Sequence, residues 1–419
     1  MVKKWIILSL MTILTALCLN SFGYALEGCT GNCHKDIVNS GEHKGVVCTS
    51  CHVSSENHYV KSVTFDTCLK CHKDYENMKN SPMHTKVNEK DFVHKVFDKV
   101  DSKFYDKNCN SCHVVNCSDC HGVDKKTHSI AKPNNETCLK CHNSYFIGHE
   151  YVGLGIRDDH ERYQRGIEFD NKSYMKMSPD IHFELGLKCA DCHDMSSISN
   201  GEKSSKVCTD CHQKVDKTVI EHKIEKHMTE LECYTCHSAW SAMEFGTFWV
   251  KFENSTYQQY FRWLTYYSNE YAKSSFYKIN DQVLIGKNEK GVYAPIRPQF
   301  ITFFTSLKDN LVQGEENKFL GGYFKSVFPH TVRRETVNCE YCHDRGKTYL
   351  LQKDEDRIFL PEKDGLKVRN FYNSWGFNML NGNFISEEEF KKINQKDNVY
   401  YKFYIEKNKQ ILNLIRNVK

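Results

Sequence analysis

The hydrophobic and polar positions divide the chain into stretches of very different character. Residues 5–19 are mostly apolar. Over residues 29–237, loops rich in Lys, Asn, Asp, Ser and Gly separate short apolar groups, so we expect short helices and few long helices or sheets. The predicted fold class is therefore mostly α and irregular, with few short helices.

Residues 238–338 are rich in aromatic side chains and are predicted to form a small α+β insert with its own core. Residues 255–273 suit an amphipathic helix, and residues 282–296 resemble a hairpin around an Asn-Glu-Lys-Gly turn. In the tail, residues 387–393 and 399–418 are predicted to be helical. Five apolar positions of the tail are expected to pack back onto the body: Tyr401, Phe403, Ile405, Ile411 and Leu414.

The N-terminal residues 1–25 have the features of a secretory signal peptide. Lys3 and Lys4 precede the apolar run, and Gly23-Tyr24-Ala25 suits a small-residue cleavage site. We therefore expect an exported protein, in the periplasm or alternatively at the cell surface or outside the cell, with no transmembrane span in the mature chain. A lipid anchor at Cys18 is disfavoured because Leu17, not a small residue, precedes it.

A cysteine pair followed by histidine recurs along the chain. Nine copies of Cys-x-x-Cys-His begin at Cys48, Cys68, Cys109, Cys117, Cys138, Cys189, Cys208, Cys233 and Cys339. In c-type haem attachment each thiol forms a thioether to a haem side group, and the adjacent imidazole binds the iron. Only three residues separate the two copies at 109–113 and 117–121, a span of about 10 Å at full extension, so their haems are expected to lie close together.

A tenth, looser copy begins at Cys29, where three residues rather than two precede Cys33 and His34. One extra residue in a loop that contains glycine can bulge out and leave the histidine nearly in place. The sequence therefore predicts ten covalently attached c-type haems.

Three other uses of paired cysteines explain the pattern less well. A tetrahedral zinc site gives no reason for a histidine directly after every second cysteine. A redox dithiol needs one such motif, and structural disulfides leave the histidines unexplained. Of the 21 cysteines, 20 belong to the ten motifs, so none remains for a separate disulfide framework in the mature chain.

These motifs define the predicted cofactor-binding residues. The thioether-forming cysteines are Cys29, Cys33, Cys48, Cys51, Cys68, Cys71, Cys109, Cys112, Cys117, Cys120, Cys138, Cys141, Cys189, Cys192, Cys208, Cys211, Cys233, Cys236, Cys339 and Cys342. The proximal iron ligands are His34, His52, His72, His113, His121, His142, His193, His212, His237 and His343.

Eleven further histidines are available for the second axial position of each iron. A haem that only carries electrons usually has both axial positions filled by the protein. His160 and His222 are the weaker candidates, because another histidine follows each in the same segment between motifs, and Met83 or Met177 are alternative ligands. The predicted distal ligands are His43, His58, His84, His94, His128, His149, His182, His227 and His330.

The motif density sets the predicted domains. Residues 26–237 carry nine motifs, so the porphyrins must supply much of the apolar core. Residues 238–338 are the haem-free insert, and residues 339–419 hold the tenth motif and the helical tail. Removing Lys3 and Lys4 lowers the formal charge from +4 to +2, and the haem propionates then make the protein acidic, so nucleic acid is not an expected partner.

With these motifs the chain resembles a multihaem c-type cytochrome. Residues 180–193 and 329–334 resemble segments of large anaerobic multihaem cytochromes, including the octahaem tetrathionate reductase and hydroxylamine oxidoreductase group. Periplasmic decahaem conduits have a similar haem number, but the 101-residue haem-free insert departs from them.

The resemblance implies two classes of function. The first is an electron carrier between a membrane quinol-oxidising complex and a terminal reductase or an outer-membrane conduit, with an oligomer or filament as an open alternative. The second is an enzyme that reduces a small nitrogen or sulfur oxyanion at one open haem. We favour the carrier and predict no catalytic residues, because the chain has no Cys-x-x-Cys-Lys motif and has enough histidines for every iron.

Overall fold

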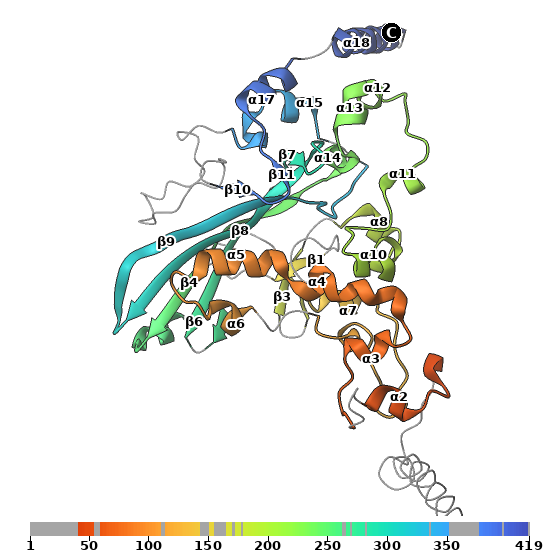
Figure 1. The fold of residues 1–419 in the computed structure, drawn as a ribbon. Helices are drawn as coiled ribbons and strands as arrows, with labels where there is room; N and C mark the ends of the chain where they lie inside the picture. Colours follow the sequence, from red (N-terminus) through yellow and green to blue (C-terminus); the bar gives the residue numbers. More distant parts are fainter. Residues whose placement is uncertain are drawn as a thin grey trace, which may run out of the picture. The chain divides into compact units, whose positions relative to one another are not determined.

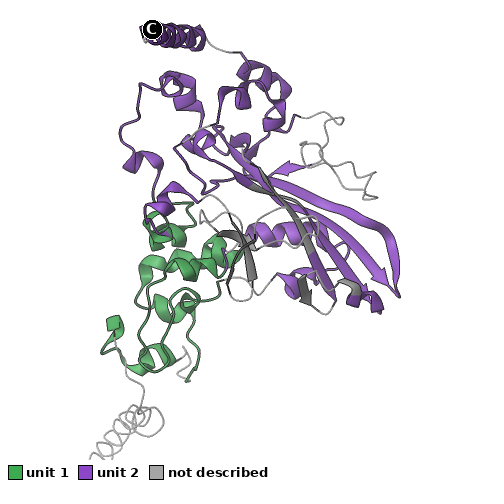
Figure 2. Cartoon of the chain, turned by 180° about the vertical axis from the view of Figure 1, so that it is seen from behind, with its two compact units in different colours: residues 1–86, 112–140, 189–205 green, residues 87–111, 141–188, 206–419 purple. Residues whose placement is uncertain are grey.

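The computed structural model describes residues 41–53, 59–109, 114–142, 151–154, 165–169, 172–176, 179–261, 265–268, 270–280, 283–334, 337–351, 377–395 and 398–417. The predicted signal peptide and the motif at Cys29 lie outside these residues, as do His58, Cys112, His113 and His149. The chain divides into two compact units (Figure 2). Unit 1 comprises residues 1–86, 112–140 and 189–205, and unit 2 comprises residues 87–111, 141–188 and 206–419.

The described part of unit 1 is built from short helical segments. They are η2 (Gly41–His43), α2 (Cys48–His52), α3 (Phe65–Leu69), η3 (Lys73–Asn80), α4 (Pro82–Thr85), η4 (Cys117–Asp119), α7 (Asn135–Leu139), α9 (Cys189–Cys192) and α10 (Met195–Asn200). Asn134 caps α7 by accepting a hydrogen bond from the Thr137 amide, and Asp194 caps α10 in the same way. Local capping therefore sets several helix boundaries.

Unit 1 buries very little apolar surface. Phe65 and Met78 are the buried hydrophobic side chains among its described residues. Contacts between η3 and α10 include a side-chain hydrogen bond of 2.9 Å from Asn77 to Asn200. Gly201 ends α10 in a left-handed conformation, and a Cβ atom there would lie 2.8 Å from the Pro82 ring, so the position requires glycine.

Unit 2 contains an eight-stranded sheet with the order β10-β9-β8-β4-β6-β5, while β7 pairs with β8 and β11 (Figure 1). Its strands are β4 (Ser241–Glu253), β5 (Thr265–Ser268), β6 (Tyr271–Asn280), β7 (Leu284–Asn288), β8 (Tyr293–Lys308), β9 (Leu311–Ser326), β10 (Asn378–Met379) and β11 (Gly382–Asn383). The β8–β9 hairpin turns at Asp309 and Asn310, whose positive φ angles are typical of a two-residue turn between twisted strands.

The helices and remaining strands of unit 2 are mostly short. The helical segments are α5 (Val87–Phe97), α6 (Phe104–Asn108), α8 (Ile181–Glu184), α11 (Cys208–Cys211), α12 (Ile220–Lys223), α13 (Glu225–Glu230), α14 (Cys233–His237), η5 (Thr256–Phe261), α15 (Cys339–His343), η6 (Gly346–Tyr349), α17 (Glu387–Ile393) and α18 (Asn398–Asn417). A separate three-stranded sheet has the order β1-β3-β2, formed by β1 (Tyr151–Leu154), β3 (Lys172–Lys176) and β2 (Arg165–Phe169).

The aromatic insert contains more β-sheet than the sequence predicted. The hairpin over residues 282–296 is confirmed by the antiparallel pairing of β7 with β8. The prediction of a helix over residues 255–273 is wrong. The described part of that range forms the short 3-10 helix η5, followed by residues of the strands β5 and β6. Pairing of β6 along β4 buries Tyr271 and Ala272 completely, and this tertiary burial outweighs the local helical periodicity.

Segments outside residues 238–338 complete the core of this sheet. Phe92 of α5 stacks on Phe300 of β8 with ring centres 4.6 Å apart, and Val96 lies so close to Gly321 that a Cβ there would be 2.7 Å from it. Phe97 stacks on Phe104, and the edge of Phe104 meets Trp249 of β4. The cluster helps to fix α5 and α6 against the strands.

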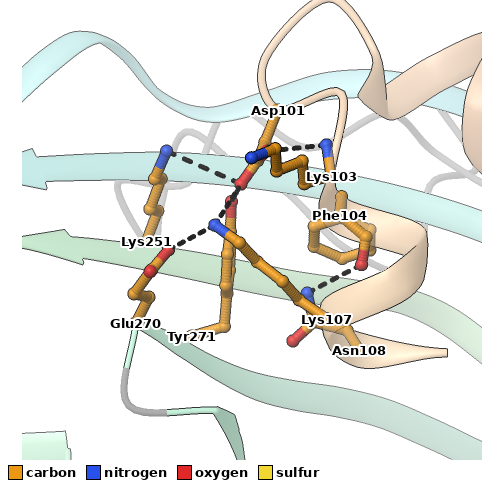
Figure 3. A network of polar contacts seen from close by, with 8 residues as sticks. All are labelled: Asp101, Lys103, Phe104, Lys107, Asn108, Lys251, Glu270 and Tyr271. Atoms are coloured by element: carbon orange, nitrogen blue, oxygen red, sulfur yellow. Dashed lines mark hydrogen bonds and ion pairs between the residues drawn. The ribbon is translucent and has the colours of Figure 1, made fainter. Parts of the chain in front are cut away.

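A polar network beside this cluster also ties the α5–α6 segment to the sheet (Figure 3). The Tyr271 hydroxyl donates a hydrogen bond of 2.7 Å to Asp101, and the Lys107 ammonium lies 3.2 Å from the same carboxylate and 2.7 Å from Glu270. Burial alone would raise the pKa of Asp101, but hydrogen bonds from the tyrosine, a backbone amide and the lysine outweigh it and lower the pKa. The charged Asp101 carboxylate therefore accepts hydrogen bonds from Tyr271, the Lys103 amide and Lys107.

The tail is helical as predicted, in α17 and α18. The expectation that its apolar side chains pack onto the body is wrong for α18, which has no buried side chain. Tyr401 is 51% exposed and Leu414 is 66% exposed. No helix within the described ranges is both long and apolar enough to span a bilayer.

Candidate functional site

Several motifs form a single helical turn that starts at or near the first cysteine. The amide of the motif histidine donates to the carbonyl of the first cysteine in four of them, at 3.0 Å for His72 and 2.9 Å for His121, His193 and His212. Residues i, i+3 and i+4 of a turn share one face, so both thiols and the imidazole lie on the same side. None of the described motif cysteines is buried, which suits attachment of a large group.

Five pairs of histidine rings lie next to each other at nearly the same separation, with interplanar angles from 35° to 78°. Each pair joins one motif histidine to one histidine outside the motifs. The ring centres are 5.9 Å apart for His43 and His72, and 6.1 Å apart for His52 and His128, His182 and His212, His222 and His237, and His227 and His343.

This separation fits an iron held between the two rings. A metal bound at about 2 Å from one nitrogen of each ring, in line, places the ring centres roughly 6 Å apart. Direct stacking of aromatic rings would allow closer approach and a wider range of distances. The described residues assemble no cluster of three or more His, Cys, Asp or Glu that could hold a metal ion.

Backbone carbonyls orient four of these ten rings, and also the ring of the motif histidine His121. The Nδ1 atom contacts a carbonyl oxygen at 2.9 Å in His52 (Val60), 3.3 Å in His121 (Ala131), 2.9 Å in His222 (Asp216), 3.1 Å in His237 (Arg333) and 2.5 Å in His343 (Ile393). A carbonyl only accepts, so Nδ1 carries the proton and Nε2 keeps its lone pair for a metal. Such hydrogen bonds are typical of metal-ligating histidines.

A carboxylate performs the same task for His182. Its Nδ1 atom lies 2.9 Å from Asp180, a buried residue that also accepts a hydrogen bond of 2.6 Å from the Val332 amide. The ring of His227 is instead enclosed, and burial lowers its pKa, which favours the neutral form that binds metals. His128 adopts a left-handed backbone conformation, with φ of 52°, at the position where it faces His52.

The ring pairs include four of the nine predicted distal ligands: His43, His128, His182 and His227. His84 donates a hydrogen bond of 2.9 Å from Nδ1 to the Val114 carbonyl, and its ring meets the Phe65 ring edge-on. His94 contacts Asp98 at 3.0 Å, and His330 lies edge-on to Phe328. His58 and His149 lie outside the described residues.

Sequence reasoning missed His222, whose ring faces that of His237. It was set aside because His227 follows in the same segment between motifs. In the structure the two histidines face different motif histidines, His237 and His343. His222 lies between the motifs at Cys208 and Cys233. It could have been predicted as a ligand if one such segment had been allowed to contribute two distal histidines, each to a different iron.

Cysteines of different motifs also meet. The first cysteines of two motifs are hydrogen-bonded through their side chains in three cases: Cys68 with Cys117, Cys138 with Cys189, and Cys208 with Cys233. The bond from Cys117 lowers the pKa of Cys68 to about 7, and the bond from Cys208 lowers that of Cys233 to about 6. The partner thiols have raised pKa values, because each pair shares one proton.

Comparison with known proteins agrees with this geometry. Residues 40–115 and 181–246, together about a third of the chain, match the family model described as Cytochrome c3. No curated protein and no solved structure matches the chain. The matched segments contain the motifs that begin at Cys48, Cys68, Cys109, Cys189, Cys208 and Cys233. The match supports the identification of the chain as a multihaem c-type cytochrome, which binds haem c covalently and transfers electrons.

Proposed function

We propose that the protein is an exported electron carrier of anaerobic respiration with ten covalent haems, most of them ligated by two histidines. The observation that carries this proposal is the set of five histidine pairs whose ring centres lie 5.9 to 6.1 Å apart. Bound haem supplies one-electron chemistry at its iron. The chain supplies the attachment points, both axial ligands and the surroundings that set each reduction potential.

The residues that would hold the haems have distinct tasks. The motif cysteines anchor each group, and the motif histidine is the proximal ligand. His43, His128, His182, His222 and His227 are the distal ligands of the motifs that end in His72, His52, His212, His237 and His343, respectively. The carbonyl acceptors of the Nδ1 protons keep each ring in its tautomer, and Asp180 makes His182 a more basic ligand.

Paired ligands favour the carrier over an enzyme. With an imidazole on both sides, the five irons have no position open to a substrate. Histidine at both positions also favours a lower potential than a histidine and methionine pair does, which suits low-potential respiratory chemistry. Redox partners are then a quinol-oxidising membrane complex as donor and a terminal reductase or an outer-membrane conduit as acceptor, with the periplasm as the proposed location.

One observation favours the alternative, a reductase of a small nitrogen or sulfur oxyanion. Tyr105 is 4% exposed, and neither its buried hydroxyl nor the Oδ1 atom of the buried Asn108 has a hydrogen-bond partner among the described residues. Asn108 directly precedes the motif that begins at Cys109, and Tyr105 lies four residues before it. Unpartnered buried polar groups beside a haem attachment site suit a ligand that brings its own donors and acceptors.

Spectroscopy of the ferric protein separates the two functions. The carrier predicts wholly low-spin signals that nitrite, hydroxylamine and tetrathionate leave unchanged. A high-spin component that responds to one of these anions, and that Tyr105→Phe alters, would establish the reductase. Mass analysis of the purified protein gives the haem count, and a mass equal to that of the bare polypeptide would overturn both functions.

The distal assignments have their own test. Replacing His222 with alanine should convert one low-spin haem to high spin, because the ring facing His237 is lost. Tyr257→Ala, at an exposed position of unit 2, is a matched control that should leave all signals low-spin. An unchanged spectrum for His222→Ala would remove His222 from the ligands.

A further inference from the structure

The helix α18 has a largely uncovered apolar surface (Figure 1). None of its side chains is buried, and its 20 residues carry eight of the 25 exposed large hydrophobic side chains in the described part of the chain. The helix contains neither cysteine nor histidine, so it neither attaches a haem nor ligates an iron. So high a density of exposed apolar side chains is typical of a binding surface. Five of them are between 51% and 66% exposed: Tyr401, Ile405, Leu412, Leu414 and Ile415.

The apolar side chains of α18 occupy one broad side of the helix. At about 100° per residue, all of its apolar and aromatic residues except Val399 fall within about 200° of the circumference, between the positions of Phe403 and Ile405. Lys407 and Asn408 are the polar residues within that arc. A two-stranded coiled coil needs only a narrow apolar stripe at two positions of each heptad. The width of the arc therefore favours a broad apolar medium over one partner helix.

The remaining side of α18 is polar and mainly basic. Lys402, Lys409 and Arg416 recur every seven residues, so they form a row along one edge of the apolar arc. Glu406 is the one acidic residue of the helix, and its carboxylate lies 3.8 Å from the Lys409 ammonium. Both side chains of this pair are more than 60% exposed, so the pair is weak and leaves the lysine available. With Lys407, four basic residues and one acidic residue give the helix a net charge of +3.

The residues within the arc suit a boundary between water and lipid. The Lys407 ammonium lies 5.6 Å from the centre of the Phe403 ring, so the apolar stem of the lysine runs along the apolar side of the helix. A lysine in this arrangement keeps its stem among apolar groups while its charge reaches the headgroups. The rings of Tyr400 and Tyr404 lie 4.7 Å apart on the same side. Tyrosine is favoured at membrane interfaces because its ring is apolar and its hydroxyl is polar.

We propose that α18 is an amphipathic helix that lies in the surface of a bilayer containing anionic phospholipids and holds the protein there. The apolar arc enters the boundary between headgroups and acyl chains, and the basic row contacts the lipid phosphates. The inference goes beyond the proposed function, because the helix binds a bilayer whether or not the haems carry electrons. For a carrier that takes electrons from a membrane complex, this binding keeps it at the surface where its donor lies.

The direct test is sedimentation of the intact haem-loaded protein with lipid vesicles. Vesicles of phosphatidylcholine and phosphatidylglycerol should bind the protein more tightly than vesicles of phosphatidylcholine alone, and added salt should weaken this difference. Lys402→Gln, Lys409→Gln and Arg416→Gln combined should weaken binding to the anionic vesicles by roughly 100-fold. Absence of binding to the anionic vesicles would overturn the proposal, as would equal binding of the native protein to both kinds of vesicle.

The apolar side of the helix is tested by a second variant with a matched control. Leu412→Asp combined with Ile415→Asp places charges on the apolar arc at exposed positions, so the protein should fold and no longer bind vesicles. Leu311→Asp changes a leucine that is 68% exposed on β9 and should bind as the native protein does. Native binding by the double variant, or an equal loss in the control, would show that α18 does not form the contact.

A second copy of the chain is the competing occupant of this surface. Analytical ultracentrifugation without lipid measures it: a dimer that the double variant dissociates, together with no vesicle binding, would overturn the membrane contact. A monomer that binds anionic vesicles supports it. The ferric spectrum of the same samples reports separately on the proposed function. High-spin signals that respond to an added anion would count against the carrier and leave the vesicle result standing.

Discussion

The two units are held together in different ways. Among its described residues, unit 1 has two buried hydrophobic side chains, Phe65 and Met78, although it contains the whole of the motifs at Cys48, Cys68, Cys117 and Cys189. Unit 2 buries several apolar clusters around its sheet, including Ile301, Phe303 and Phe324. The described part of unit 1 therefore has almost no polypeptide core, whereas the sheet of unit 2 has one.

The apolar side chains of unit 1 are largely on its surface. Val46, Val47, Tyr59, Val115 and Ile130 are all exposed. A chain that leaves such side chains uncovered and buries so few others cannot offset the loss of conformational entropy on folding. The comparison predicts that unit 1 depends on its haems for cohesion, and that the sheet depends on them much less.

The strongest way to break this comparison is to remove the haems. A chain produced without residues 1–25, the predicted signal peptide, is expected to receive no haem. It should lose hydrogen-exchange protection throughout residues 59–86 and 114–140, because few buried apolar side chains remain there. Amides of β4, β8 and β9 in unit 2 should stay protected by the paired strands. Hydrogen exchange with mass spectrometry measures both regions at once. Equal protection of unit 1 with and without haem would contradict a haem-dependent core.

The next largest effect is expected in the sheet core. Phe97→Ala deletes a ring that is almost fully buried between Phe104 and Phe304, so it should lower the free energy of unfolding of the sheet by about 3–5 kcal/mol. Chemical denaturation of the haem-loaded protein, followed by tryptophan fluorescence, measures this change. The haem absorption of unit 1 should unfold at an unchanged midpoint. A shift of the haem transition with no shift in fluorescence would reverse the assignment of the two cores.

A smaller effect is expected at the polar network of Figure 3. Tyr271→Phe removes the 2.7 Å hydrogen bond to the charged Asp101, which should cost about 1.5–3 kcal/mol of stability in unit 2. The same denaturation experiment measures it. Tyr401→Phe, which alters a tyrosine on the exposed helix α18, should change stability by less than the experimental error. Similar losses in both variants would argue against a special role for the network.

The smallest effect is expected at a helix cap in unit 1. Asn134→Ala removes the side-chain oxygen that accepts from the Thr137 amide at 2.9 Å, so it should destabilise α7 by about 1 kcal/mol. Hydrogen exchange of the amides in α7 measures the local change. Asn134→Ser keeps an acceptor and should retain most of the protection. Identical exchange in the two variants would show that haem attachment alone fixes this helix.

Local features of the sequence predicted local features of the structure. The Cys-x-x-Cys-His spacing corresponds to single helical turns, the Asn-Glu-Lys-Gly turn to the β7–β8 hairpin, and the tail periodicity to α17 and α18. Residues 265–280 were not foreseen as strands, because their pairing with β4 is a contact between distant segments. Propensity within one segment cannot reveal such a partner.

The same limit applies to the histidine pairs. His43 lies just before the motif at Cys48 but faces His72 of the following motif, and His128 faces His52 from 76 residues away. The sequence predicted His43 and His128 to be ligands from the number and position of the histidines, but it did not predict which motif histidine each ring would meet. Which rings meet depends on the path of the backbone in the folded protein, and this path cannot be deduced from the positions of the histidines in the sequence.

The Nδ1 acceptors have a consequence for how freely this chain can diverge. For His52, His121 and His237 the acceptor is a main-chain oxygen, at Val60, Ala131 and Arg333. A main-chain oxygen is present whatever side chain occupies the position, and it does not titrate. Substitutions at these three positions can therefore accumulate without turning the imidazoles, whereas a one-residue deletion nearby would misalign a ring and expose its iron to exogenous ligands.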